Sequence, residues 1–165
     1  MKLRGKAHKF GDSVNTDYII SGRYKFKIQD PKELAKYLME DLRPEFYKDI
    51  KKGDFIVAGS NFGCGSSREQ APLAIKYAGI SAVIAQSFAR IFFRNAINLG
   101  LLLIECETDG IKEDDLLEAN TEAGYLLNMR NSIRKDIKPL PSFMNEIIKD
   151  GGVIKHFKKH KGFKF

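Results

Sequence analysis

The sequence has few cysteines and no long apolar run, and both absences restrict what the protein can be. Its two cysteines, Cys64 and Cys106, stand far apart and form no Cys-x-x-Cys pair. This excludes a disulfide framework and gives no support to a metal or iron–sulfur site that the chain builds alone. Any metal chemistry would therefore have to come from a partner.

No apolar run is long enough to cross a bilayer, and the first residues, Met1 to Lys6, lack the apolar stretch of a secretion signal. We therefore expect a cytoplasmic protein with no membrane partner. The chain also lacks internal repeats, low-complexity segments and a Pro/Gly-rich linker. Its 165 residues with 43% hydrophobic content suit a single compact domain that spans residues 1–165.

Basic residues exceed acidic ones, 28 against 21, which gives a net charge of +7. Part of this excess lies in a basic tail, residues 155–165. It holds Lys155, Lys158, Lys159, Lys161 and Lys164. The excess favours anionic partners, and a polycarboxylate, a nucleic acid or an acidic protein surface would each qualify. A solvated, partly frayed terminus explains the tail equally simply.

The middle of the chain alternates short apolar runs with segments of helical spacing, and glycines follow the helices. The pattern predicts strands at 55–58, 80–85 and 101–104, joined by helices at 67–77 and 87–99. Strand, helix, strand, helix, strand in succession implies parallel strands with right-handed crossovers. We therefore assign the chain to the α/β class, with a βαβαβ core.

The flanking segments are less regular. A helix is predicted from Pro31, with Asp30 as its N-cap and Pro44 as its end. An amphipathic helix is predicted at 141–149. Residues 1–29 and 105–140 carry short apolar patches and turn signals, which we interpret as additional strands and loops.

The chemically informative segment is a glycine-rich loop between the strand at 55–58 and the helix after it. It contains three glycines, two adjacent serines, Ser66 and Ser67, and Arg68. Ligands of α/β sheets bind beyond the carboxyl ends of the strands, where a helix N-terminus attracts anions, and an arginine fork matches a carboxylate. Alternatively, the serines are only helix caps, since each starts a capping-box pattern, and Arg68 forms a surface ion pair.

Two nucleotide-binding patterns are absent from this loop. A dinucleotide-binding loop needs a glycine where Arg68 stands and an acidic residue where Gln86 and Ser87 stand. A triphosphate-binding loop needs a Gly-Lys pair, and this loop has no lysine. Carboxylate binding therefore ranks above nucleotide binding.

Three segments, in conserved order and spacing, carry a resemblance to a known family. They are Asn15 to Ile20, Gly59 to Glu69 and Ser87 to Asn95. All three closely resemble the small subunits of 3-isopropylmalate dehydratases, and also the mobile C-terminal domain of aconitase. The likeness extends from Gly5 to about Gly152 and implies the swivel-type α/β domain of the aconitase superfamily. Gln70 departs from the histidine of many relatives, and we assign it no role.

The resemblance implies a hydro-lyase of leucine biosynthesis, which isomerises 2-isopropylmalate to 3-isopropylmalate through an alkene. A large partner subunit would hold a four-iron four-sulfur cluster, and this chain would bind none. By the same resemblance, Ser66 is the base, and Ser67 and Gly65 lie at the substrate. It also implies that Arg68 binds a substrate carboxylate and that Asp17 points into the site. Homoaconitate or another substituted malate is the alternative substrate. From its sequence context alone, Asp17 could be a turn residue.

In this family the segment Gly22 to Gln29 lies over the substrate side chain and varies with specificity. Its basic residues could meet a distal carboxylate, and its apolar residues an isopropyl branch, or the segment is simply a solvated loop. The resemblance therefore adds a set of candidate substrate-binding residues, Arg23, Tyr24, Lys25, Phe26 and Lys27.

A serine base requires that something stabilise its alkoxide. A helix N-terminus contributes at most about 2 kcal/mol. Arg68, backbone amides and a closed site must supply the rest, so we expect the chain to be inert without its partner. A nucleic-acid-binding module, using the basic tail with Phe157, Phe163 and Phe165, is the distant alternative, because the chain lacks a nucleic-acid-binding motif.

Overall fold

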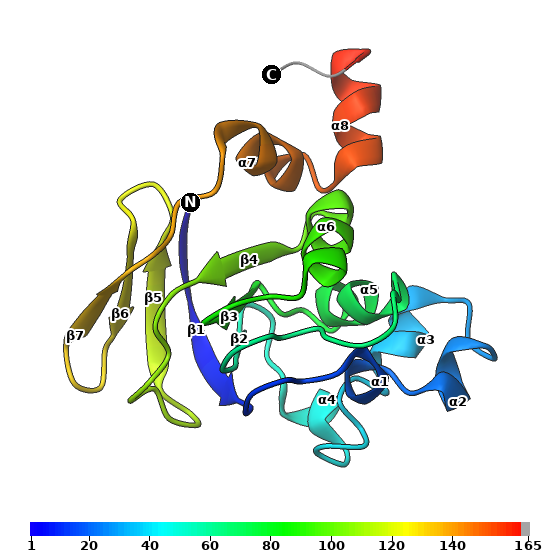
Figure 1. Cartoon of the computed structure of the whole chain (residues 1–165), viewed down its shortest axis with the longest axis horizontal. Helices are drawn as coiled ribbons and strands as arrows, with labels where there is room; N and C mark the ends of the chain where they lie inside the picture. The colour runs from blue at the N-terminus through cyan, green and yellow to red at the C-terminus, as the bar shows by residue number, and fades with distance from the viewer. Residues whose placement is uncertain (163–165) are drawn as a thin grey trace.

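The structure is a computed structural model that describes residues 1–162. In this part of the chain, seven strands form one sheet in the order β4-β3-β2-β1-β5-β6-β7. Most of the helices lie on the side of the parallel strands, and the antiparallel strands lie on the opposite side (Figure 1). None of the helices among these residues is long and apolar enough to span a membrane.

The parallel half of the sheet is the predicted βαβαβ unit with one further strand. It consists of β1 (Lys2–Lys9), β2 (Phe55–Val57), β3 (Ala82–Ala85) and β4 (Leu102–Glu105). The crossovers contain α5 (Gln70–Tyr77) and α6 (Arg90–Leu99). Gly79 and Gly100 follow these helices with positive φ angles of 93° and 74°, as expected of left-handed helix ends. The predicted α/β core is therefore confirmed.

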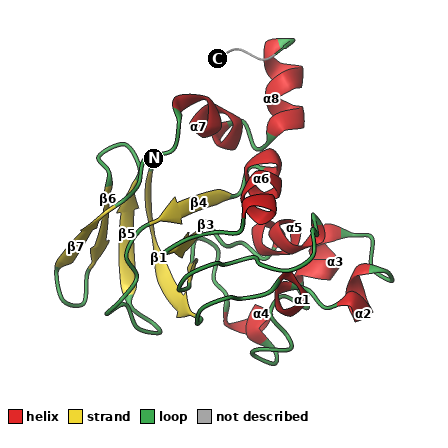
Figure 2. Ribbon diagram, viewed as in Figure 1, coloured by secondary structure: helices red, strands yellow, loops and turns green. Residues whose placement is uncertain are grey.

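The antiparallel half confirms the additional strands predicted after residue 105. It consists of β5 (Leu116–Asn120), β6 (Tyr125–Asn128) and β7 (Ile133–Asp136). Strand β1 joins the two halves: Lys2 to Lys6 pair with β5, whereas Ala7 to Lys9 pair with β2. Because β1 belongs to both halves, the parallel and antiparallel strands form one continuous sheet that bends along β1 (Figure 2).

Alternate residues of the parallel strands supply two separate cores. On β2, Ile56 faces one core with Val83 and Leu103, while Phe55 and Val57 face the other. The first core lies under α5, α6 and three short helices: α1 (Thr16–Ile19), α3 (Pro31–Ala35) and α4 (Phe46–Asp49). The second is shared with the antiparallel strands and with α7 (Ser142–Lys149).

The N-terminal third differs from its predicted strands and loops. Besides β1 it contains α1 and α2 (Gly22–Lys25), which are too short to show a helical period. The helix capped by Asp30 also ends early, at Ala35. Met39 has a φ of 56°, and its amide bonds to the carbonyl of Ile19, 2.9 Å away. The chain therefore leaves the helix to pack against α1.

Part of the basic tail, residues 155–160, lies in a helix. Helix α8 (Val153–His160) follows α7, and its His156 is buried. Of the aromatic residues proposed to stack on nucleic acid, Phe157 lies on α8. Phe163 and Phe165 lie outside the described residues.

Candidate active site

Three loops at the carboxyl ends of β1, β2 and β3 are joined by backbone hydrogen bonds. The Gly63 amide donates to the carbonyl of Val14, and the Thr16 amide donates to the carbonyl of Cys64, both at 2.8 Å. On the other side, the Phe62 amide donates to Ser87 at 3.0 Å, and the Ala89 amide donates to Phe62 at 2.9 Å. The glycine-rich loop is thus fixed between the other two.

Glycine is required where these loops pack most closely. A side-chain carbon at Gly63 would lie 2.2 Å from Phe92 Cγ, and one at Gly65 would lie 2.5 Å from Asn15 Oδ1. Both glycines also have positive φ angles, 80° and 89°. Asn15 is the N-cap of α1, because its Oδ1 accepts from the Asp17 amide at 2.9 Å. The glycines therefore allow α1 and α6 to approach the loop.

The glycine-rich loop, the start of α1 and the first turns of α6 line an open cavity of about 420 Å³. The two adjacent serines and three arginines line it. The full lining is Thr16, Asn61, Gly63, Gly65, Ser66, Ser67, Arg68, Ala89, Arg90, Ile91, Phe92 and Arg94. The structure thus brings Gly65, Ser66, Ser67 and Arg68 to one cavity at the end of the sheet where ligands of α/β proteins bind.

Arg68 is the most buried of the three arginines that line this cavity. Its side chain is 12% exposed and forms an ion pair with Asp17, which is 51% exposed. Its Nη1 also donates to the carbonyl of Ile20 at 3.4 Å. Its Nε is buried and has no hydrogen-bond partner within residues 1–162. Asp17 therefore lies beside the cavity as a partner of Arg68, and the guanidinium keeps one buried N–H that forms no hydrogen bond within the described residues.

The two serines are not helix caps. Helix α5 begins at Gln70, and its N-cap, Glu69, makes no side-chain capping bond. Ser66 and Ser67 are exposed, and neither hydroxyl has a hydrogen-bond partner among the residues that the structure describes. The helix was predicted to start at Ser67, so its positive end lies farther from Ser66 than expected.

The sequence did not identify Arg90 and Arg94 as site residues. Both lie on α6, are exposed and form no ion pair in the described part of the chain. The segment 87–95 was one of the three that carry the family resemblance, and this was the available signal. Three arginines make the cavity strongly cationic, which suits an anion with more than one carboxylate.

The segment from Arg23 to Lys27 does not line this cavity. It contains α2, which lies at the edge of the molecule beside α3 (Figure 1). Arg23 forms an ion pair with Asp41, and the ring of Tyr24 stacks on Tyr37 with centroids 4.0 Å apart. Phe26 is 81% exposed, with the Lys25 ammonium 4.6 Å from its ring centroid. Arg23 and Tyr24 are therefore held by residues outside the cavity, and Phe26 faces solvent.

Comparison with known proteins identifies the family. The model of the aconitase C-terminal domain family matches residues 13–109, which contain the three segments that carry the resemblance. The chain is 57% identical over 155 residues to 3-isopropylmalate dehydratase small subunit 1 of Archaeoglobus fulgidus, covering 93% of this chain and 96% of that relative. This chain belongs to the family of 3-isopropylmalate dehydratase small subunits within the aconitase C-terminal domain family.

Other relatives agree with this family assignment. The 3-isopropylmalate dehydratase small subunit of Halothermothrix orenii is 55% identical over 160 residues, covering 96% of both chains. The crystal structure of 3-isopropylmalate dehydratase from Methanocaldococcus jannaschii superposes with a TM-score of 0.94 and 48% identity, covering 98% of this chain and 96% of that one. The swivel-type α/β fold implied by the resemblance is therefore confirmed.

Proposed function

We propose that this chain is the small subunit of a 3-isopropylmalate dehydratase, a hydro-lyase that converts 2-isopropylmalate to 3-isopropylmalate in leucine biosynthesis. The observation that carries this proposal is the cationic cavity with two unpaired serine hydroxyls. The relatives, which are small subunits of this enzyme, support it. We expect the chain to act as one domain, in the cytoplasm, together with a large subunit.

The chain's own residues do not fit the cluster of this superfamily. A four-iron four-sulfur cluster requires several cysteine thiolates, and the chain has two cysteines in total. Burial raises the pKa of the Cys106 thiol to about 11, and the Cys64 Sγ lies 3.3 Å from the carbonyl of Ser13. We therefore assign the cluster to the large subunit, where it would act on the leaving hydroxyl as a Lewis acid.

Arg68 would bind a substrate carboxylate. Its guanidinium is already held by Asp17 and by the Ile20 carbonyl, so little side-chain entropy remains to be lost on binding. Its position in the cavity beside Ser66 and Ser67 would place the bound acid next to both hydroxyls. Arg90 and Arg94 would attract the second carboxylate of a malate-type substrate.

Ser66 would take the proton from the carbon next to the departing hydroxyl. Because α5 begins only at Gln70, the helix end contributes little to an alkoxide at Ser66. The three arginines of the cavity are the stronger stabilising charges. Since Ser66 is exposed in this chain, water must be excluded by the large subunit before those charges act at full strength.

The substrate side chain would be selected by the segment from Arg23 to Lys27 once the two subunits assemble. The exposure of Phe26 leaves an apolar side chain available for an isopropyl branch. Arg23 is engaged by Asp41, which weakens the alternative of a distal carboxylate. These contacts favour isopropylmalate over homoaconitate as the substrate.

The proposal is tested by mixing the chain with a cluster-loaded large subunit and following the absorbance of the alkene. Ser66→Ala should lower turnover by about a hundredfold or more, the usual contribution of a general base. Ser142→Ala is the matched control, because Ser142 is exposed on α7 and its hydroxyl has no hydrogen-bond partner among the described residues. Full activity of the Ser66 variant would refute the assigned base. Faster turnover of homoaconitate than of isopropylmalate would refute the assigned substrate.

A further inference from the structure

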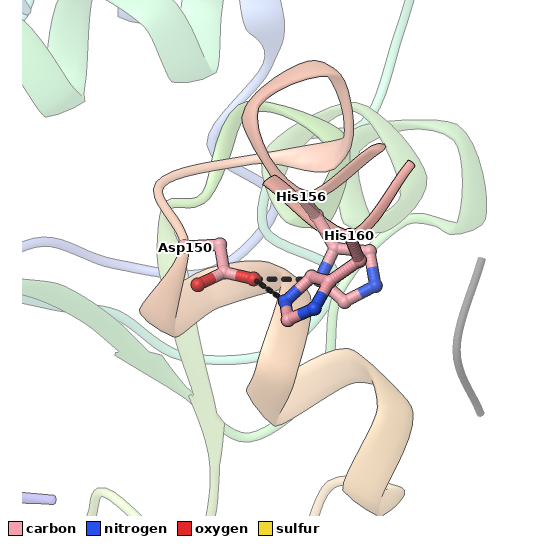
Figure 3. A group of neighbouring side chains, drawn as sticks. All are labelled: Asp150, His156 and His160. Carbon is pink, nitrogen blue, oxygen red and sulfur yellow. Dashed lines mark hydrogen bonds and ion pairs between the residues drawn. The ribbon is translucent and has the colours of Figure 1, made fainter. Parts of the chain in front are cut away.

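A second group of potential ligands lies where α7 meets α8. Asp150 is the C-cap of α7, and His156 and His160 stand one turn apart on α8 (Figure 3). They account for two of the three histidines in the chain. The cluster lies on different elements from the three loops of the cavity, and none of its members lines that cavity.

The turn between the two helices fixes this arrangement. Gly151 and Gly152 have φ angles of 83° and 121°, which other residues rarely adopt. A side-chain carbon at Gly152 would lie 2.7 Å from the carbonyl oxygen of Asn98, so the turn packs directly on the end of α6. Asp150 and the start of α8 are therefore held in place by the backbone before any ligand binds.

The three side chains converge on one carboxylate oxygen. Asp150 Oδ2 lies 2.7 Å from His156 Nδ1 and 2.9 Å from His160 Nε2. All three potential ligand atoms lie within 4.8 Å of one another. The side chains of Asp150 and His156 are only 6% and 3% exposed, and that of His160 is 25% exposed. The cluster is thus largely shielded from water and open on the His160 side.

We propose that Asp150, His156 and His160 bind a divalent transition-metal ion of the Zn²⁺ or Co²⁺ type. Two imidazoles and one carboxylate are the donor set of such ions, whereas Ca²⁺ and Mg²⁺ prefer oxygen ligands. Each imidazole binds the ion through the nitrogen that now faces Oδ2 and carries its proton on the other ring nitrogen, so a neutral ring changes tautomer and a protonated ring releases one proton to solvent. Ligand atoms bound at about 2.0–2.2 Å in a tetrahedral site lie roughly 3.3 Å apart. The two nitrogens now lie 2.7 and 2.9 Å from Oδ2, so each needs to move about half an ångström farther from this oxygen.

Lys159 is the group that competes with the ion. Its ammonium lies 2.5 Å from Asp150 Oδ1, the other oxygen of the same carboxylate. Its side chain is 65% exposed, so it can turn into solvent and leave Oδ2 to the ion. Removing the Lys159 charge should therefore tighten metal binding. This dependence separates a metal site from a network that only stabilises the end of α8.

The test uses the full chain without an affinity tag, stripped with a chelator and titrated with Co²⁺ and Zn²⁺ by calorimetry, with the visible spectrum of Co²⁺ as a second signal. We expect one ion per chain. His160→Gln should weaken binding at least about tenfold, a change expected even for loss of an outer-shell partner. Lys159→Ala should bind more tightly than wild type. Lys158→Ala, which removes the same charge from a residue lining a different cavity, should change affinity less.

Thermal unfolding without metal verifies that His160→Gln remains folded, which is expected because His160 is the most exposed of the three ligands. Zn²⁺ should raise the melting temperature of the wild type and not that of the variant. The proposal is overturned if the wild type binds less than one ion per chain, or if His160→Gln and Asp150→Asn bind the ion as tightly as the wild type. Either result is independent of the proposed dehydratase activity.

Discussion

Thr16 Oγ1 donates a 2.8 Å hydrogen bond to the carbonyl oxygen of Ser66. Thr16 is buried at the start of α1, while Ser66 is exposed in the glycine-rich loop. This bond therefore fixes the backbone of the proposed base from a segment 50 residues away in sequence. Because the hydroxyl of Ser66 has no such partner among the described residues, its position depends on its backbone.

Replacing Thr16 by Val should lower activity without abolishing it. The methyl group fills the same space but leaves the Ser66 carbonyl without its donor, at a cost of about 1–3 kcal/mol. We expect kcat of the reconstituted enzyme to fall about tenfold, with little change in KM. Thr16→Ser keeps the hydroxyl and should restore most of the activity. Equal loss in both variants would mean that the hydrogen bond is not what positions Ser66.

Replacing Arg68 by Lys should weaken substrate binding although the positive charge is kept. A lysine cannot hold Asp17, the Ile20 carbonyl and a substrate carboxylate with one planar group. We expect kcat/KM to fall by about a hundredfold, mainly through KM, in steady-state assays with the large subunit. Arg43→Lys is a matched control, because Arg43 pairs with Glu113 outside the cavity. Wild-type KM in the Arg68 variant would exclude it from carboxylate binding.

Replacing Gly63 by Ala should destabilise the protein, whereas Gly11→Ala should not. The new methyl group at position 63 would collide with Phe92, in a backbone conformation that alanine rarely adopts. Together these effects should cost about 2–4 kcal/mol. The space around Gly11 is open, so its variant should stay within about 0.5 kcal/mol of wild type. Urea unfolding measures both, and equal stabilities would mean that the loop relaxes away from α6.

The Asp54 carboxylate should make the free energy of unfolding decrease at acidic pH. Burial by itself would raise the pKa of this carboxyl, but hydrogen bonds from the Lys51 amide, His8 and the Lys6 amide hold the pKa below its ordinary value. A depressed folded-state pKa adds stability that is present above the unfolded pKa, about 3.9, and is lost as pH falls through the folded value.

Asp54→Asn should therefore be less stable than wild type near neutral pH, and the difference should narrow below about pH 4. The free energy of unfolding, measured by urea titration at several pH values, checks this. Glu33→Gln is a control, because Glu33 is exposed and pairs only with Lys36 in the described structure. A difference between wild type and Asp54→Asn that stays constant with pH would contradict the assignment.

The sequence by itself determined the parallel core and the position of the glycine-rich loop. Short apolar runs, helical spacing and the glycines after each helix are local signals, and α5, α6 and β2 to β4 follow them. It also indicated which residue types could bind a carboxylate. The family resemblance rested on three contiguous motifs, Asn15 to Ile20, Gly59 to Glu69 and Ser87 to Asn95, which are readable without a structure.

Only the tertiary structure decided which distant residues meet. In the structure, α5 begins at Gln70 and not at Ser67. Arg90 and Arg94 line the cavity, whereas α2 lies outside it. Part of the basic tail forms α8, and this helix places two histidines beside Asp150. Such outcomes depend on packing between segments far apart in the chain, such as Thr16 against Ser66, and no local pattern encodes which pairs will form.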